Sequence, residues 1–324
     1  MSSMKKIIFC VLILFIPCSC DQGNPYPEDR SDGALKINIS QTGSLQNPAW
    51  SPDGSSILFT RFRSGYNEEP ADLFVVKLSD LSLRTLVSDG SGNINLPGSS
   101  WVGNKIVFAS TREPHDEVYI IDENGNPGDE IQVTGRSGKV AYEPSLSPDG
   151  QWVVFESHIL DAEGNGVITK YRIDGTASYQ DLTDEGDDCR QPNWSPSGDL
   201  ILYQKYSAGQ WNIWVMSTDG TNKKQVTSGA GDKTDASFSP DVQWILYSSD
   251  EGVLEYANLY IIPVAGGNPV RVTTYNGGYD GAPSWSPDGT RIAFESCAGD
   301  PDGSAGTSLW IIEVPDLHYI QEEV

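Results

Sequence analysis

The segment Pro48–Phe59 reads PAWSPDGSSILF, and its pattern returns four more times along the chain. Each copy places an apolar or aromatic residue before a Ser-Pro pair and a run of β-branched and aromatic residues after it. Ser-Pro-Asp-Gly suits a type I turn, because Pro presets φ at the second position and Gly is favoured at the fourth. The pattern therefore predicts a strand, a tight turn and a second strand. The other copies are Pro144–Phe155, Pro192–Tyr203, Ala236–Tyr247 and Pro283–Phe294.

A sixth, degenerate copy is Ser99–Phe108 (SSWVGNKIVF), which lacks the Ser-Pro-Asp-Gly turn and is two residues shorter there. With Trp101 marking it, successive copies lie about 44–50 residues apart. Each copy is followed by a third apolar run, such as Leu73–Val76, and by a short polar fourth run, such as Gln132–Thr134. Four strands per repeat of this length are typical of a propeller blade. We therefore predict an all-β, six-bladed β-propeller.

The ends of the chain predict how the ring closes. Residues 35–40 (LKINIS) resemble the fourth strands, yet they precede the first copy. They are predicted to form the outer strand of the last blade, which joins the two ends and removes an exposed sheet edge. The C-terminal stretch Leu317–Val324 is an alternative for the same place.

These repeats resemble the WD40-like β-propeller repeat of the TolB-like family, over nearly all of residues 35–316. The resemblance implies a six-bladed propeller. It is less specific for function, because such propellers occur in peptidases, lyases and binding proteins.

The first 20 residues are interpreted as an export signal. Lys5 and Lys6 precede ten apolar residues, Ile7–Ile16, which fit a secretory core and are too short to span a bilayer. The following residues resemble a bacterial lipoprotein signal with Cys20 as the lipidated residue, although Pro17 replaces the usual Leu. Ordinary signal-peptidase cleavage is the alternative. We expect a propeller (35–324) on the periplasmic side of the cell envelope, held by an N-terminal lipid and a flexible tether (21–34).

The net charge of −24 across 324 residues argues against a nucleic-acid partner, because the chain would repel phosphate backbones. A basic peptide, a cation or a neutral ligand fits this field better. In the predicted topology the Ser-Pro-Asp-Gly turns share one face, here called the turn face. The opposite loop face holds the loops between blades and those between second and third strands. These loops carry 21 of the 45 acidic residues and seven basic ones.

The residues just before the inner strands are predicted to ring the mouth of the central channel on the loop face. These residues are candidate contacts for a ligand or partner. The alternative is that they form hydrogen bonds to neighbouring blades. Exposed aromatics such as Tyr66, Trp211 and Tyr256 are candidate sugar contacts, whereas the recurring Trp50, Trp194 and Trp285 indicate packing between blades. The predicted ring comprises Asn47, Glu143, Gln191, Asp235 and Asp280.

The sequence contains no clear motif for catalysis, metal binding or a disulfide. There is no G-x-S-x-G elbow, and His115, His158 and His318 lack metal-binding spacing. No cofactor is predicted, although Asp/Asn/Gly clusters such as 122–126, 184–188 and 300–303 leave Ca²⁺ as an alternative. Cys189 and Cys297 fall in blades that are not neighbours, which favours two separate thiols over a disulfide.

The sequence thus favours a non-catalytic binding or scaffold protein whose acidic loop face holds an envelope protein or peptide. The negative net charge favours a basic partner. The alternative is a carbohydrate-binding protein or an envelope enzyme that uses the channel mouth. No catalytic residue is assigned, and the sequence does not determine the oligomeric state.

Overall fold

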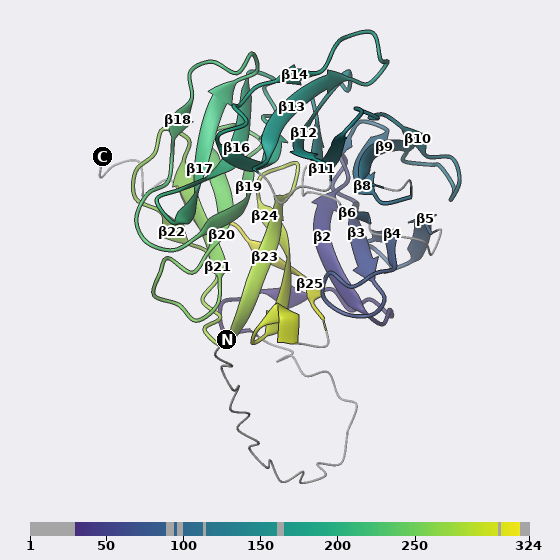
Figure 1. Cartoon of the computed structure of the whole chain (residues 1–324). Helices are drawn as coiled ribbons and strands as arrows, with labels where there is room; N and C mark the ends of the chain where they lie inside the picture. Colours follow the sequence, from purple (N-terminus) through teal and green to yellow (C-terminus); the bar gives the residue numbers. More distant parts are fainter. Residues whose placement is uncertain are drawn as a thin grey trace, which may run out of the picture.

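The computed structural model describes residues 30–88, 94–95, 100–112, 115–160, 165–303 and 306–317. Six antiparallel sheets follow one another around the molecule, and the last lies beside the first (Figure 1). The prediction of a six-bladed β-propeller is confirmed. The predicted export signal, Cys20 and His318 lie outside the described residues. Within the described part, no helix has the length and apolar character needed to cross a membrane.

In each blade the first strand named below lies at the central channel and the last lies at the outer edge. Blade 1 is β2 (Ser44–Trp50), β3 (Ser56–Phe62), β4 (Ala71–Lys77) and β5 (Leu83–Val87). Blade 2 is β6 (Ile94–Asn95) and β7 (Trp101–Val102), both paired with β8 (Lys105–Ser110), then β9 (Glu117–Asp122) and β10 (Ile131–Gln132). Blade 3 is β11 (Lys139–Leu146), β12 (Trp152–Ile159), β13 (Val167–Arg172) and β14 (Gln180–Asp181).

The remaining blades repeat the plan. Blade 4 is β15 (Asp188–Trp194), β16 (Leu200–Ser207), β17 (Gln210–Ser217) and β18 (Lys224–Gln225). Blade 5 is β19 (Lys233–Phe238), β20 (Trp244–Ser249), β21 (Asn258–Pro263) and β22 (Val270–Arg271). Blade 6 is β23 (Gly278–Trp285), β24 (Arg291–Ala298), β25 (Ser308–Glu313) and the N-terminal strand β1 (Leu35–Lys36), with a short 3₁₀ turn at Pro301–Gly303.

The Ser-Pro-Asp-Gly turns form as their residues predict. In blade 1 the Gly54 N–H donates to the Ser51 carbonyl at 2.9 Å, the i to i+3 bond of a β-turn. The Ser51 hydroxyl donates to the Asp53 carboxylate at 2.6 Å, so the side chains brace the same turn. Gly54 sits at a φ of 69°, where a side chain is disfavoured. Blade 5 is an exception, because Val242 occupies this position at a φ of 59°.

Six apolar clusters hold the blades together, one for each pair of neighbours around the ring. The second strand of each blade supplies a large aromatic ring that is at most 1% exposed, and burying such a ring is worth about 1.5–3 kcal/mol. Each blade therefore gains its core by contact with its neighbours, as repeat architectures require. The rings belong to Phe59, Phe108, Phe155, Tyr203, Tyr247 and Phe294.

The N-terminal strand closes the ring. In β1, Leu35 and Lys36 pair with Ile311 and Trp310 of β25, and the Ile37 N–H donates to the Leu309 carbonyl at 2.9 Å. The prediction of closure by residues after 35 is confirmed. At the other end, Leu317 packs against the cluster between blades 5 and 6, and residues 318–324 lie outside the described part.

Part of the predicted tether is not free of the propeller. Residues 21–29 lie outside the described part, but residues 30–34 pack on blade 6. Arg30 and Ala34 are both buried, at 6% and 0% exposure. The polar composition of residues 21–34 predicts a flexible segment throughout. Its last five residues differ because one arginine finds a buried partner, described below.

Candidate functional site

Five inner strands carry the same irregularity where they line the channel. Each has a β-bulge, and one bulge residue adopts a left-handed φ between 44° and 53°. A bulge turns this residue out of the ladder and re-aims its side chain. In four of the five blades the next residue is Pro, which has no N–H to place in the ladder. The bulge residues are Asn47, Glu143, Gln191, Asp235 and Ala282.

All five bulge residues line one small cavity of about 30 Å³ in the channel. Four of the five predicted ring residues are therefore brought together. Asp280 does not lie with them. It precedes the bulge of blade 6 by two positions and is fully buried, so Ala282 takes the equivalent place.

Hydrogen bonds link the ring from blade to blade. The Gln191 side-chain amide donates to Asp235 at 2.9 Å, and the Asp235 backbone N–H donates back to the Gln191 side-chain carbonyl at 3.0 Å. The Gln191 backbone N–H donates to Glu156 at 2.9 Å. On the opposite side, the Asn47 backbone N–H donates to Glu295 at 2.9 Å. Bonding between neighbouring blades, the alternative role predicted for ring residues, therefore does occur.

Glu156 and Glu295 are functional candidates that sequence reasoning missed. Each directly follows the buried aromatic residue of a second strand, in blades 3 and 6, and each is at most 6% exposed. A charged residue inside an apolar strand was the available signal, since buried acids are rare unless paired. Burial, together with a smaller contribution from the Asp235 charge, raises the pKa of Glu295 to about 8.

Around Glu295 lie two tyrosines. The Tyr66 hydroxyl donates to Glu295 at 3.2 Å and lies 3.4 Å from the Tyr279 hydroxyl. Burial raises the pKa of both phenols, so each stays protonated. Burial also raises the pKa of Asp235, despite the hydrogen bonds from Gln191 and Thr234. Tyr66, predicted to be an exposed aromatic, is instead partly buried against Glu295.

A second polar group lies between blades 2 and 3. The His158 ring nitrogen Nε2 lies within hydrogen-bond distance of the Glu156 carboxyl, at 3.1 Å. The His158 and Tyr142 rings pack edge to face, with their centroids 5.5 Å apart. Burial raises the pKa of Asp116 to about 6, even with a hydrogen bond from Tyr142. The loop end of the channel therefore concentrates carboxyl groups whose ionisation is costly.

The basic residues of the loop face do not neutralise this acidity. Arg63, Arg136 and Arg190 pair with Asp72, Asp181 and Asp188, which lie outside the ring. Lys139 and Lys205 likewise pair with Glu185 and Asp187. In the described part of the chain, no lysine or arginine pairs with Asp235 or Glu295. Asp235 and Glu295 therefore lie at the channel without a basic partner among the described residues.

Asp280 instead anchors the N-terminal segment. Arg30 donates to both Asp280 oxygens, at 2.6 and 2.8 Å, and to the Ser296 hydroxyl at 3.1 Å. It also donates twice to Asp32, at 3.1 and 2.6 Å. All five donors of the guanidinium are therefore used. The Tyr275 ring lies 4.7 Å from the guanidinium carbon, which adds a cation–π contact.

Other predicted chemistry has these outcomes. Cys189 and Cys297 are separate buried thiols, as predicted. Trp50, Trp194 and Trp285 pack in the clusters between blades, as predicted. Across the described ranges, no three His, Cys, Asp or Glu side chains gather closely enough to hold a metal ion.

Comparison with known proteins identifies the family. The model of the TolB beta propeller domain matches residues 29–256 and 189–300. The chain belongs to this family. The Tol-Pal system protein TolB of Francisella tularensis subsp. holarctica (strain OSU18) is 29% identical over 201 residues, 61% of this chain and 44% of that protein. The protein TolB homolog of Chlorobium luteolum is 30% identical over 141 residues, 43% of this chain and 30% of its own length.

Solved structures agree with the TolB-type fold. The putative TolB from Agrobacterium tumefaciens has a TM-score of 0.62 at 18% identity, over 84% of this chain and 91% of that one. An oligogalacturonate lyase in complex with manganese has a TM-score of 0.57 at 13% identity, over 89% and 95%. These likenesses show the propeller alone. This chain spans less than half the length of the curated TolB relatives described above.

Proposed function

We propose that this TolB-type propeller is a non-catalytic binding protein of the cell envelope, on its periplasmic side. It holds a basic segment of a protein partner at the loop-face mouth of its channel. The observation that carries this proposal is the presence of two buried carboxyls, those of Asp235 and Glu295, close enough for the charge of Asp235 to act on Glu295. Burial raises the pKa of both carboxyls, the Asp235 charge contributes to the raised pKa of Glu295, and no lysine or arginine of the described chain neutralises them. The Tol-Pal relatives add the envelope setting.

A lysine or arginine from a partner would supply the missing charge. Glu143 and Asp235 line the cavity at the mouth and are both half-buried, whereas Glu295 is fully buried, so the first two are the more accessible carboxyls. An incoming cation favours the ionised forms of acids whose pKa is raised. Binding is therefore expected to release protons and to tighten as the pH rises towards 8.

We expect charge reversal of Glu143→Lys together with Asp235→Lys to weaken binding of a tetralysine peptide at least tenfold, because both acids at the mouth become cations. Titration calorimetry at pH 8 measures this, and a pull-down from solubilised envelope tests the natural partner. The matched control is Asp199→Lys with Glu313→Lys, an equal charge change at two exposed sites away from the ring. Equal losses in both double variants would show only a general charge effect and contradict the proposal.

A second candidate function rests on an aromatic surface next to the ring. The Tyr206 and Trp211 rings lie 5.3 Å apart, Tyr206 is 46% exposed, and Arg190 stacks 5.1 Å from Trp211. Aromatic rings next to the guanidinium group of an arginine form a suitable surface for binding a sugar. A glycan array is expected to show hits that Trp211→Ala removes. If glycans bind equally to both proteins, or to neither, this candidate fails and the protein-binding function stands unaffected.

A further inference from the structure

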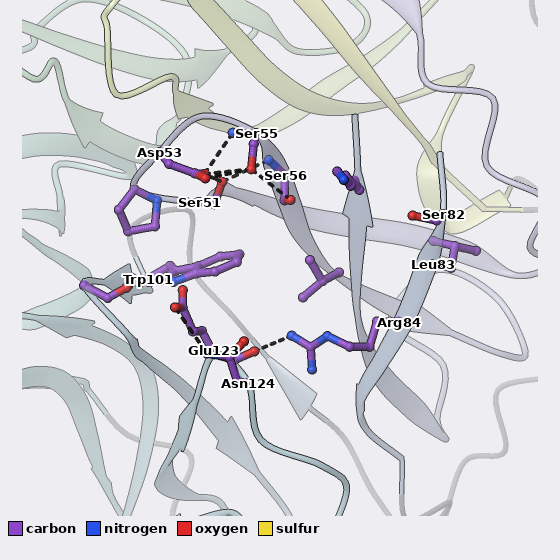
Figure 2. A pocket seen from close by; sticks show the side chains of 14 residues that line it. Ser51, Asp53, Ser55, Ser56, Ser82, Leu83, Arg84, Trp101, Glu123 and Asn124 are labelled. Atoms are coloured by element: carbon purple, nitrogen blue, oxygen red, sulfur yellow. Dashed lines mark hydrogen bonds between the residues drawn. The ribbon is translucent and has the colours of Figure 1, made fainter. Parts of the chain in front are cut away.

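A groove lies on the turn face between blades 1 and 2. Its volume is about 540 Å³, within the range of about 300–1,000 Å³ that is usual for small-molecule sites in proteins. Figure 2 shows Trp101 of β7 between the turn at 51–56 and residues 123–124, with Arg84 of β5 across the groove. The groove is separate from the loop-face mouth, because the turns that line it lie at the other ends of the strands.

The irregular turn of blade 2 leaves this groove open. Only Gly103 and Asn104 connect β7 to β8, in place of a Ser-Pro-Asp-Gly turn. A methyl group added to the turn glycine of blade 4 or blade 6, Gly198 or Gly289, would lie 3.9 or 3.8 Å from the turn proline of the preceding blade. A methyl group added to Gly103 would meet nothing within 4 Å. The shorter turn therefore leaves space that turn residues fill at other blade boundaries.

The same irregularity uncovers an indole ring. Trp101 is partly buried, whereas the residues at the same repeat position in the other five blades are at most 8% exposed. The Trp101 indole N–H donates to the Gly103 carbonyl at 3.1 Å, so its donor is used within the chain and its ring is what it offers to a ligand. Val75 and Leu83 also line the groove and add apolar surface. The five buried residues at this repeat position are Trp50, Leu146, Trp194, Phe238 and Trp285.

A second groove, between blades 3 and 4, provides an internal comparison. Its volume is about 440 Å³, and Trp152 and Trp194 line it. The Lys170 ammonium and the Arg172 guanidinium lie 5.2 and 5.9 Å from the centre of the Trp152 ring, and Trp194 is only 7% exposed. Such cation–π contacts cover the face of an indole. The aromatic surface of this second groove is therefore taken up by the chain itself.

The charged residues of the groove between blades 1 and 2 balance one another. Two acids, Asp53 and Glu123, line it, and so do two bases, Lys77 and Arg84. Arg84 donates to the backbone carbonyls of Glu123 and Gly125, which holds its guanidinium at the rim. The groove is therefore locally neutral in a chain whose net charge is −24. A lining of this kind favours neither a polyanion nor a polycation, so it suits an uncharged ligand.

The uncharged polar residues of the groove supply both donors and acceptors. Ser55, Ser82 and Asn124 line it and are exposed. A hydroxyl group and a side-chain amide can each donate and accept hydrogen bonds. The hydroxyl groups of a sugar also do both, and the C–H groups of its ring form an apolar face. An open indole ring among such side chains therefore matches the two kinds of surface that a sugar has.

We propose that the groove between blades 1 and 2 binds a neutral oligosaccharide. One sugar ring stacks its C–H face on Trp101, and its hydroxyl groups form hydrogen bonds with the polar side chains of the rim, among them Ser82 and Asn124. The balanced charges exclude no uncharged sugar but give an acidic sugar no advantage. This site is independent of the basic-segment site at the channel mouth and of the aromatic surface at Trp211, both of which lie on the loop face.

Titration calorimetry with three uncharged sugars tests this site: cellotetraose, maltotetraose and fully N-acetylated chitotetraose. We expect at least one to bind, and we expect Trp101→Ala to weaken its binding about tenfold because the stacking face is lost. Trp152→Ala is the matched control, because it removes another partly buried indole from a groove on the same face, and it is expected to bind as the wild type does. Ser82→Trp fills the groove from an exposed position and is expected to abolish binding without disturbing the core.

Absence of binding by all three sugars at millimolar concentration would overturn the proposal. So would equal or tighter binding of tetragalacturonate, an anionic sugar of the same length, or unchanged affinity in both Trp101→Ala and Ser82→Trp. Loss of binding in Trp211→Ala alone would place the sugar on the loop face instead. The double variant Glu143→Lys with Asp235→Lys is expected to bind the sugar as the wild type does. Failure at the groove and failure at the channel mouth are therefore distinguishable.

Discussion

Replacing Arg30 by alanine is expected to lower the free energy of unfolding by about 3–5 kcal/mol, because it leaves buried carboxylates without their cation. The Arg30 side chain is 1% exposed, Asp280 is 0% exposed and Asp32 is 4% exposed. Hydrogen bonds from Arg30 and from the Thr274 N–H hold the pKa of Asp32 below its usual range. Urea denaturation of the wild type and the variant at pH 7 measures the difference.

Two further variants separate charge from geometry. Arg30→Lys keeps the charge but cannot form the two parallel bonds to Asp280, so it is expected to lie between the wild type and Arg30→Ala. The double variant Arg30→Met with Asp280→Leu removes both charges and is expected to cost less than the sum of its single changes. If Arg30→Ala lies within about 0.5 kcal/mol of the wild type, the value typical of surface substitutions, the segment 30–34 does not anchor the fold.

Glu295→Gln is expected to stabilise the protein at alkaline pH. The pKa of Glu295 is about 8 in the folded protein against an ordinary 4.5, so the folded state retains a proton that the unfolded state has lost. Stability from this group is therefore fully present below about pH 4.5 and is lost as the pH rises to about 8. At about 1.4 kcal/mol per pKa unit, the loss totals about 5 kcal/mol.

The amide in Glu295→Gln removes that titration but weakens one hydrogen bond, from Tyr66 or the Asn47 N–H, at about 1–3 kcal/mol. We therefore expect the variant to exceed the wild type by about 2–4 kcal/mol at pH 9. Urea denaturation at several values between pH 5 and pH 9 checks this. Glu313→Gln, an exposed site, is the control and is expected to follow the wild type. The same slope in all three proteins would mean that Glu295 is ionised when folded.

The fold follows from the sequence because its signals are local and repeated. Each Ser-Pro-Asp-Gly turn closes its own bond between the first and fourth residues, as in Ser51 and Gly54. The aromatic residue after each turn is buried in every blade. The closing strand at 35–36 also had a local signal, since it resembles the fourth strands without a preceding copy.

The ring was predicted less completely because a bulge, rather than the start of a strand, sets which residue faces the channel. Counting four residues back from the turn serine identifies Asn47, Glu143, Gln191, Asp235 and Ala282. Asp280 was chosen by its place before a strand, but β23 begins earlier and continues through its bulge. The X-Pro pair that marks four of the five bulges was the better signal.

The sequence by itself determined the six blades, the turn geometry and the excess of acids in the loops, because these depend on residue type and spacing within one repeat. Tertiary structure decided which acids meet, that Arg30 reaches Asp280 across 250 residues, and that four indole rings from four blades line one cavity. Such groups come from different blades. Their burial, and hence the raised pKa of Glu295, exists only when the ring has closed.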